Sequence, residues 1–365
     1  MKISCDKNVL LEGINIVQKA VSPKSTMPIL EGILLEASDN LKLVGSDLDL
    51  GIECYLSAFV EEEGAVVLNA RIFGEIVRRL PDDVVYIEVL ENYNTNIKCG
   101  NTEFNIMGIN PIEFPELPKV QKENTIIITQ DKLRSMIRQT IFAVGTKESK
   151  IILTGSCLEL DGNEINMVSV DGYRLALRKE ILDSVYEKQS IVIPGKTLNE
   201  LAKIIKEEEK KISLHISPKH VLFEFDECRI VSRLLEGEFL NYKHIIPKEY
   251  QLRVKVKVKP MIEAIERCAL IILSDTQKHP IIISIGTDVI NISCRTQTGT
   301  VYDSLDAETY GSDLQIGFNY KYLLEALKAC ECEEVYMEFN TSLSPCVIKP
   351  IEGDSFTHLI LPVRF

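Results

Sequence analysis

Several features that would point to particular classes of protein are scarce or absent in this sequence. Its 365 residues include no tryptophan and only five histidines, and no histidine stands at metal-ligand spacing from a cysteine or carboxylate. Positive charge is in deficit, because 41 lysines and arginines face 54 aspartates and glutamates, for a formal net charge of −13. This deficit excludes a uniformly basic surface that grips nucleic acid or anionic membrane, but it leaves room for a local basic lining.

Long apolar runs are missing as well. No segment approaches the roughly 18 apolar residues of a membrane span, and the N-terminal MKISCDKNVL lacks the apolar centre of a signal peptide. The ten cysteines are spread along the chain without the dense spacing of a secreted scaffold, and Cys330 and Cys332 are the only close pair. We therefore expect a cytoplasmic protein with buried thiols, no membrane partner, no metal and no cofactor.

What the sequence does contain is one unit repeated three times. The predicted helices NARIFGEIVRRL, PGKTLNELAKII and NYKYLLEALKAC share one pattern, and their equivalent residues 71, 196 and 321 are each 125 positions apart. In each helix the spacing places the apolar residues on one face. These stripes are Phe73, Ile76, Val77 and Leu80, then Leu198, Leu201, Ala202 and Ile205, then Leu323, Ala326, Leu327 and Cys330.

A second predicted helix opens each unit, and strand-like segments fill the intervals. Segments such as GIECYL, INMVSVDG and VINISCRT are β-branched or alternating and are separated by Gly, Asp and Asn. Proline-bearing stretches near residues 115 and 247 mark two junctions. We predict an α+β fold of three tandem domains, residues 1–122, 123–248 and 249–365, each with two helices packed on antiparallel sheet. The opening helices carry Leu10, Gly13, Ile14, Val17 and Val21, then Leu133, Met136, Ile137, Thr140 and Val144, then Met261, Ala264, Ile265, Cys268 and Ile272.

The helix faces opposite these stripes are basic. A solvated surface charge is the ordinary interpretation of any single lysine or arginine there, but three copies in register favour a shared basic stripe. If the three units pack side by side, acidic residues collect on the sheet side. The basic residues are Arg71, Arg78, Arg79, Arg134, Arg138, Lys196, Lys203, Lys321 and Lys328.

Two motifs look chemical. Gly195-Lys196-Thr197 resembles the end of a phosphate-binding loop, but that loop needs a glycine at position 190, which is Ser190. A helix starting at Pro194 is the stronger interpretation. GSDLDLGIE is expected to place Asp47 and Asp49 on one face of a strand, where paired carboxylates can hold Mg²⁺. No third ligand can be assigned, so we predict no catalytic residues.

The segment VSVDGYRLAL, residues 168–177, interrupts a strand-like run. An Asp-Gly pair suits a tight hairpin, because such turns need a positive φ. That explains Asp171-Gly172 and leaves Tyr173-Arg174 as residues at a hairpin edge.

Taken together, KSTMPILEGILLEA, GSDLDLGIE, VDGYRLAL and the ending LILPVRF closely resemble the DNA polymerase III beta subunit family, the bacterial replication sliding clamps. The resemblance runs the full length. It implies a non-enzymatic processivity factor, a head-to-tail homodimeric ring around double-stranded DNA with helices lining the hole. Contacts to phosphate would be sequence-independent. Lys24 and Lys196 match DNA-facing positions of the family, and Lys147 and Lys150 are further candidates.

The resemblance also implies a pocket between the middle and C-terminal domains. There the replicative polymerase, the clamp loader and repair factors bind through short glutamine- and leucine-containing peptides. Val170, Leu240 and His244 stand where threonine, proline and arginine are common in the family, which bears on the peptide preference. The matched residues are Leu153, Val170, Gly172, Tyr173, Arg174, Leu175, Leu240, His244, Ile245, Asn319, Tyr322, Leu343, Pro345, Leu361, Pro362, Val363 and Arg364.

A subunit interface is implied by the same resemblance. Phe104 and Ile106 of one chain would face Ile272 and Leu273 of the partner, although a core role for these four is the alternative. Three other readings stay open from the residues alone. One is a Mg²⁺-dependent phosphoryl-transfer enzyme that uses Asp47 and Asp49, another is a repeat scaffold that never encloses DNA, and the third is a specialised paralogue.

Overall fold

The structure is a computed structural model that describes residues 1–365 apart from 123–124, 147, 274–278 and the side chains of 148 and 149. The chain forms two compact units. The first unit comprises Met1–Gln130 and Lys203–Leu234, and the second comprises Asp131–Ala202 and Leu235–Phe365. Among the helices of the described residues, none has the length and apolar content needed to cross a membrane.

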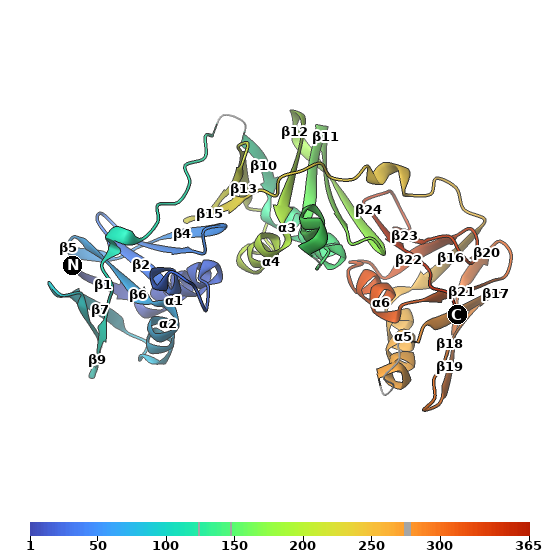
Figure 1. Cartoon of the computed structure of the whole chain (residues 1–365), viewed down its shortest axis with the longest axis horizontal. Coiled ribbons are helices and arrows are strands. Elements are labelled where there is room, and N and C mark those ends of the chain that lie inside the picture. Colours follow the sequence, from blue (N-terminus) through green and yellow to red (C-terminus); the bar gives the residue numbers. More distant parts are fainter. Residues whose placement is uncertain (123–124, 147, 274–278) are drawn as a thin grey trace. The chain divides into compact units, whose positions relative to one another are not determined.

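The first unit holds two antiparallel sheets (Figure 1). The larger sheet joins strands from residues 32–69 to strands from residues 125–233, through the pairing of β15 with β4. In spatial order it contains β10 Thr125–Thr129, β13 Lys211–Ile216, β14 His220–Phe225, β15 Cys228–Arg233, β4 Leu50–Leu56, β3 Leu41–Ser46, β2 Gly32–Ala37 and β6 Gly64–Asn69. The smaller contains β5 Phe59–Glu62, β1 Lys2–Asp6, β7 Val84–Val89, β8 Asn94–Cys99 and β9 Thr102–Met107.

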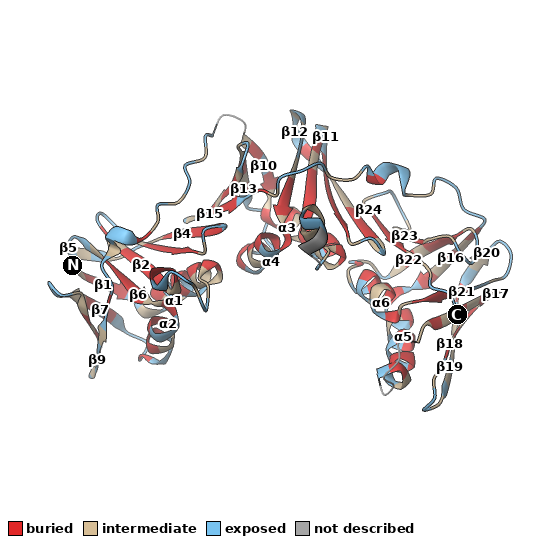
Figure 2. Cartoon of the chain, viewed as in Figure 1, coloured by how far each residue is buried: buried red, intermediate tan, exposed pale blue. Residues whose placement is uncertain are grey.

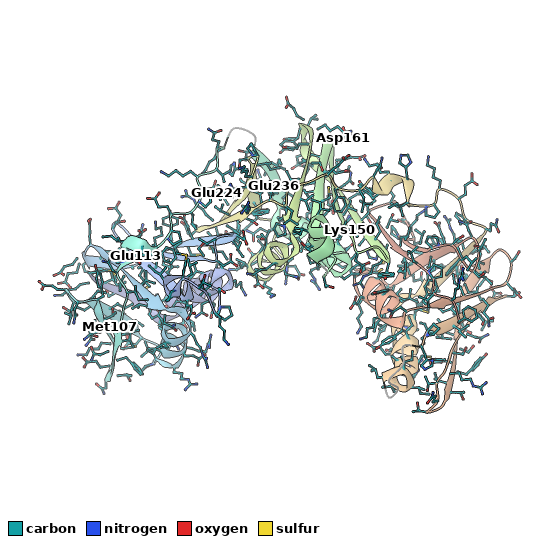
Figure 3. All side chains as sticks on the ribbon, viewed as in Figure 1. Met107, Glu113, Lys150, Asp161, Glu224 and Glu236 are labelled. Carbon is teal, nitrogen blue, oxygen red and sulfur yellow. The ribbon has the colours of Figure 1, made fainter. Side chains whose placement is uncertain are left out.

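The second unit is built in the same way. Its larger antiparallel sheet joins the long β11–β12 hairpin to C-terminal strands, through the pairing of β12 with β24. Figure 3 labels Asp161, which lies part-way along β11. In order the sheet contains β11 Gly155–Val170, β12 Arg174–Pro194, β24 Phe356–Ile360, β23 Cys346–Pro350, β22 Glu334–Phe339, β16 Leu252–Lys257 and β20 Glu308–Tyr310. The smaller contains β19 Thr300–Asp306, β18 Val289–Arg295, β17 Ile281–Gly286 and β21 Leu314–Phe318.

The described residues contain two α-helices for each repeat. Three of the helices begin at residues 70, 195 and 320, again 125 positions apart. Side-chain oxygens of Asp6, Asn69 and Asn319 accept N–H groups in the first turn of α1, α2 and α6, which satisfies donors that the helix itself leaves unpaired. The helices are α1 Lys7–Val17, α2 Ala70–Arg79, α3 Gln130–Thr140, α4 Gly195–Ile204, α5 Val258–Leu273 and α6 Tyr320–Lys328. Short 3₁₀ turns are η1 Gln18–Ala20, η2 Pro28–Glu31, η3 Pro111–Glu113, η4 Ile141–Ala143, η5 Glu148–Thr154 and η6 Tyr242–His244.

The predicted apolar stripes form the core between helices and sheets. Figure 2 shows the buried side of each helix turned toward the strands, with the exposed side away from them. Phe73, Leu198 and Leu323, which occupy related stripes of the three repeats, are each fully buried. The predicted three-repeat α+β fold is therefore confirmed. Ala202, Val21 and Val144 are only half-buried members of their stripes.

Two local expectations were wrong. Asp47 and Asp49 do not share a strand face, because both lie in the turn between β3 and β4. Oδ1 of Asp47 accepts the N–H groups of Asp49 at 3.1 Å and Leu50 at 2.8 Å, so this carboxylate shapes the turn. Pro194 ends β12, and α4 starts one residue later at Gly195 than expected. The GKT segment is thus the first turn of a helix that directly follows a strand.

A buried histidine joins α6 to the larger sheet of the second unit. His358 of β24 is fully buried, and its Nδ1 lies 3.1 Å from the carbonyl oxygen of Ala326. The rings of Phe142 and Phe356 lie 5.1 and 5.0 Å from its ring. Burial in these apolar surroundings lowers the pKa of His358 from 6.5 to about 4. The imidazole is therefore neutral in the folded chain at pH 7.

We predict that His358 makes folding stability depend on pH between about 6.5 and 4. Below 6.5 the unfolded chain binds a proton that the folded chain cannot, so stability falls as the pH drops toward 4. The full loss is roughly 3 kcal/mol, from a pKa lowered to about 4. Urea unfolding at several pH values measures it. His358→Leu should flatten this part of the profile, whereas His244→Gln, at an exposed position, should leave it unchanged.

Equal slopes for wild type and His358→Leu between pH 6.5 and 4 would show that other groups account for the loss.

Candidate functional site

The VSVDGYRLAL segment forms the tight end of the β11–β12 hairpin. Val170 pairs with Leu175, and the four residues between them make the turn. Gly172 has φ +92°, a conformation that side chains disfavour. Oδ1 of Asp171 accepts the N–H groups of Tyr173 at 2.9 Å and Arg174 at 3.1 Å. The predicted Asp-Gly turn is confirmed, and its geometry determines where Tyr173 and Arg174 lie.

Arg174 is held on several sides. Its side chain is only 10% exposed, and its Nε donates to Oδ2 of Asp171 at 2.9 Å. A second nitrogen pairs with Glu325 of α6. The guanidinium also lies 4.6 Å from the ring centre of Tyr322 and 5.4 Å from that of Phe142. Such a cation is rigid, because a nearly buried guanidinium needs its ion pairs to offset lost hydration.

Tyr173 differs from its neighbour in being open to solvent. It is 54% exposed, and its ring stacks on Tyr322 with centroids 5.9 Å apart and an interplanar angle of 22°. Stacking on a fixed partner limits the rotamers of an exposed ring. A rigid aromatic surface therefore stands at the hairpin end.

The C-terminal tail reaches this turn by backbone pairing. Arg174 pairs with Ile360 across β12 and β24, and the N–H of Leu361 donates to the carbonyl of Tyr173 at 2.9 Å. Farther along, the N–H of Val363 donates to the carbonyl of Gly317 at 2.9 Å. A Cβ on Gly317 would come within 2.6 Å of the Phe365 ring. A glycine at this position allows the tail to approach β21.

Beneath the turn and tail lies an apolar cluster, here called the turn–tail cluster. It joins side chains of the hairpin, of the C-terminal strands and of the segment after residue 234. Its buried members are Cys157, Val168, Val170, Leu175, Leu177, Val192, Tyr242, Val347 and Leu359, and partly buried members are Ile152, Leu235, Phe239, Leu240, Ile246 and Leu361. The hydroxyl of Tyr242 donates to Glu159 at 2.6 Å. Burial and this hydrogen bond raise the pKa of Tyr242.

The structure brings eight of the residues predicted for the pocket together in two adjoining groups. Val170, Leu175, Leu240 and Leu361 are in the turn–tail cluster, while Gly172, Tyr173, Arg174 and Tyr322 form the turn and its contacts. The remaining residues belong to neither group: the N–H of Ile245 donates to the carbonyl of Tyr242 at 3.0 Å, Asn319 caps α6, and Leu343 is 71% exposed. They are Leu153, His244, Ile245, Asn319, Leu343, Pro345, Pro362, Val363 and Arg364.

Sequence reasoning missed many residues that build this region, and four of them show why. Leu177 and Tyr242 belong to the cluster, and Phe142 and Glu325 hold Arg174. Alternation along a strand was a usable signal for Leu177, since it shares a face with Leu175. No comparable local pattern marks Phe142 or Glu325, because their contacts with Arg174 span long stretches of chain.

The predicted basic residues lie mostly on exposed helix faces. Arg134 is half-buried, and its Nε donates to the carbonyl of Ala202 at 3.2 Å. Arg78 and Arg79 pair with Glu75, and Lys328 pairs with Glu266, which partly offsets the positive charge. Lys147 lies outside the described residues. The exposed members are Lys24, Arg71, Arg78, Arg79, Arg138, Lys150, Lys196, Lys203, Lys321 and Lys328, and Figure 3 labels Lys150.

The residues predicted for a subunit interface differ in exposure. Phe104 is 38% exposed and borders a cavity of about 640 Å³ that Ile72 and Arg79 also line. In the second unit Leu273 is 66% exposed, whereas Ile272 is 6% exposed and packs in the core. Ile106 is half-buried. Exposed apolar surface is thus present on β9 and at the end of α5.

A larger cavity, about 710 Å³, lies in the first unit away from the turn–tail cluster. Its walls come from β2, β3, β4, β14 and β15 and from residues 111–122. The charges lining it are largely paired, since Glu224 (labelled in Figure 3) binds Lys122 at 2.7 Å and Arg229 at 2.8 Å. The surface at the turn–tail cluster is the better candidate for recognition, because it presents the exposed aromatic ring of Tyr173 above a buried apolar cluster.

Known families and structures resemble the chain along its whole length. Three family models match it: the DNA polymerase III beta subunit N-terminal domain at residues 1–118, the central domain at 127–241 and the C-terminal domain at 243–364. The beta sliding clamp of Staphylococcus aureus is 35% identical over all of this chain and 99% of its own length. No group of three or more metal-binding side chains occurs among the residues that the structure describes.

Solved structures of sliding clamps are also similar to the chain over its whole length. The DNA polymerase sliding clamp of Bacillus subtilis is 36% identical, with a TM-score of 0.96 over 100% of this chain and 99% of that one. A sliding clamp of Pseudomonas aeruginosa bound to griselimycin is 25% identical, with a TM-score of 0.94 over 100% of both chains. The matches cover all three repeats and the order of their elements. The chain therefore belongs to the DNA polymerase III beta subunit family, the non-enzymatic sliding clamps of bacterial replication.

Proposed function

We propose that the chain forms a head-to-tail homodimeric ring that encloses double-stranded DNA in the bacterial cytoplasm. In this proposal its domains are residues 1–122, 123–248 and 249–365. The turn–tail cluster tethers replication proteins to the ring. The observation that carries the tethering site is the hydrogen bond from Leu361 to Tyr173, because it joins the hairpin turn and the C-terminal tail into one surface.

The proposed ligands are short glutamine- and leucine-containing peptides of the replicative polymerase, the clamp loader and repair factors. Tyr173 supplies an exposed aromatic face, and Leu361 and Val363 supply apolar side chains along the tail. Arg174 is rigid, so the surface is organised before a peptide binds. Val170 has a methyl group in place of the threonine hydroxyl, and Leu240 has a longer aliphatic side chain in place of the proline ring, which favours peptides with large aliphatic residues at those contacts.

Removing Leu361–Phe365 should lower the affinity for a polymerase-type peptide at least about tenfold, because the tail's apolar contacts and its backbone join to Tyr173 are lost. Fluorescence anisotropy of a labelled peptide, titrated with each protein, measures this. Leu48→Ala, at a residue 56% exposed in the first unit, is the matched control and should bind as wild type does.

Saturable binding of equal strength by the truncated chain would place the peptide site elsewhere. Absence of binding by the intact chain would mean that Val170, Leu240 and His244 select a different peptide.

For DNA, we propose that the exposed basic helix faces line the hole. Arg71, Lys196 and Lys321 occupy the same position in three repeats, and each is exposed. Repeated lysine and arginine that contact phosphates suit sliding, since phosphates carry no sequence information. With a net charge of −13, enclosure retains DNA more than bulk attraction does.

Reversing Arg71, Lys196 and Lys321 together to glutamate should shorten retention on circular DNA several-fold. Loss of three phosphate contacts per subunit, six per ring, should also reduce the salt slope of DNA binding by about 5.4. Reversing Lys98, Lys219 and Lys257, exposed lysines of the sheets and their turns, makes the same change in net charge and should have little effect. Undiminished retention by the first variant would defeat the assigned inner face.

For the ring, we propose that the end of α5 from a second copy packs against Phe104 and into the cavity lined by Ile72 and Arg79. Leu270 and Leu273 are 68% and 66% exposed, which suits an apolar contact on a partner. β9 is an edge strand of its sheet, and pairing across subunits would cover such an edge.

Leu273→Asp should convert the dimer to a monomer of 41.2 kDa, because a buried unpaired carboxylate is costly at an interface. Light scattering at micromolar concentration reads the mass directly. Val185→Asp, at a residue 80% exposed on β12, is the control, and this variant should keep the mass of a dimer. An unchanged mass for Leu273→Asp would exclude this contact.

A further inference from the structure

Two cysteines far apart in the sequence lie side by side in the first unit. Cys54 belongs to β4 and Cys228 to β15, and they are separated by 174 positions. Their sulfur atoms are 2.7 Å apart. All ten cysteines are free thiols, and only Cys228 and Cys332 are partly exposed. The two sulfurs in contact thus belong to cysteines far apart in the sequence, and Cys330 and Cys332 are close only along the chain.

The strand register suits a bond between the two sulfurs. Cys228 is directly opposite Cys54, and the N–H of Tyr55 donates to the carbonyl of Glu227 at 2.9 Å. Because that neighbouring pair is hydrogen-bonded, the cysteine pair occupies a non-hydrogen-bonded position. Such positions hold the Cα atoms about 4.5 Å apart, within the range of about 4.4–6.8 Å that a disulfide spans. Forming the bond needs little backbone movement.

The two thiols differ in access. Cys54 is 1% exposed, whereas Cys228 is partly exposed. The hydrogen bond to Cys228, burial and the nearby carboxylates of Glu12 and Glu53 raise the pKa of Cys54. An external reagent can therefore reach Cys228 first, while Cys54 is held against it as a protected second thiol.

We propose that Cys54 and Cys228 form a reversible oxidation site, at which a low-molecular-weight disulfide produces a cross-strand disulfide. The Cys228 thiol loses its proton to water and its sulfur attacks one sulfur of the reagent RSSR, which gives a mixed disulfide and releases RS⁻. The Cys54 sulfur then attacks the Cys228 sulfur, loses its proton and releases the second RS⁻. Two protein thiols are oxidised, and RSSR is reduced to two RSH.

The bond would tie two family domains together at their shared sheet. β4 lies in the segment matched by the N-terminal domain and β15 in the segment matched by the central domain. Closing a loop of this length restricts the unfolded chain strongly and so stabilises the fold. The site adds a redox response to the clamp function and does not depend on peptide or DNA binding.

Oxidised glutathione is the test reagent. The reduced full-length protein is incubated with it, alkylated under denaturing conditions, and analysed as an intact mass and as peptides digested without reduction. We expect two of the ten thiols to escape alkylation and one peptide pair linking Cys54 to Cys228. The melting temperature should rise by about 5 °C, and dithiothreitol should reverse both changes.

Variants separate the two steps of the reaction. Cys54→Ser should retain one stable glutathione on Cys228, because the second thiol is missing. Cys228→Ser should keep its remaining thiols free, and Cys332→Ser, which removes the other partly exposed cysteine, should form the disulfide as wild type does. Ten alkylated thiols in treated wild type, a stable wild-type glutathione adduct, or a link between other cysteines would each overturn the proposal. The wild-type peptide map decides the matter even if a variant fails to fold.

Discussion

Backbone pairing at two strand joints is the constraint on which the rest of the structure depends. β15 pairs with β4 in the first unit and β12 pairs with β24 in the second, so each larger sheet combines strands of successive repeats. Antiparallel hydrogen bonds tolerate little slippage, because a shift of one residue turns every side chain to the opposite face. The joints thereby determine which residues of different repeats become neighbours, and this applies both to the turn–tail cluster and to the cysteine pair.

Where β12 pairs with β24, the strand register places buried apolar side chains next to the ion-paired Arg174. Leu175 and Leu359 are paired and buried in the cluster, while Arg174, one position earlier, is held by Asp171 and Glu325. Burying each large aliphatic side chain contributes about 1.5–3 kcal/mol, which supports a rigid base under the exposed Tyr173. The region therefore combines a packed apolar base with an exposed aromatic ring, as the proposed peptide-binding surface requires.

The basic residues of the helices lie on the faces opposite the apolar stripes. Apolar stripes such as the one containing Phe73 and Val77 bind the helices to the sheets, so Arg71 and Arg78 must point away from the core. An acidic chain can present basic helix faces in this way, because helix periodicity separates the two kinds of residue. Pairing of Arg78 and Arg79 with Glu75 shows that part of this charge is already balanced within the helix.

The sequence by itself determined the repeat, the helices and the Asp-Gly turn, because these depend on periodicity and on local backbone preferences within a few residues. It also pointed to Tyr173 and Arg174 through the family resemblance. It misplaced Asp47 and Asp49, since an Asx turn there competes with the strand pattern. Only the tertiary structure decided that Phe142 and Glu325 hold Arg174 and that Cys228 lies against Cys54, because pairing between distant strands and helices leaves no local pattern in the sequence.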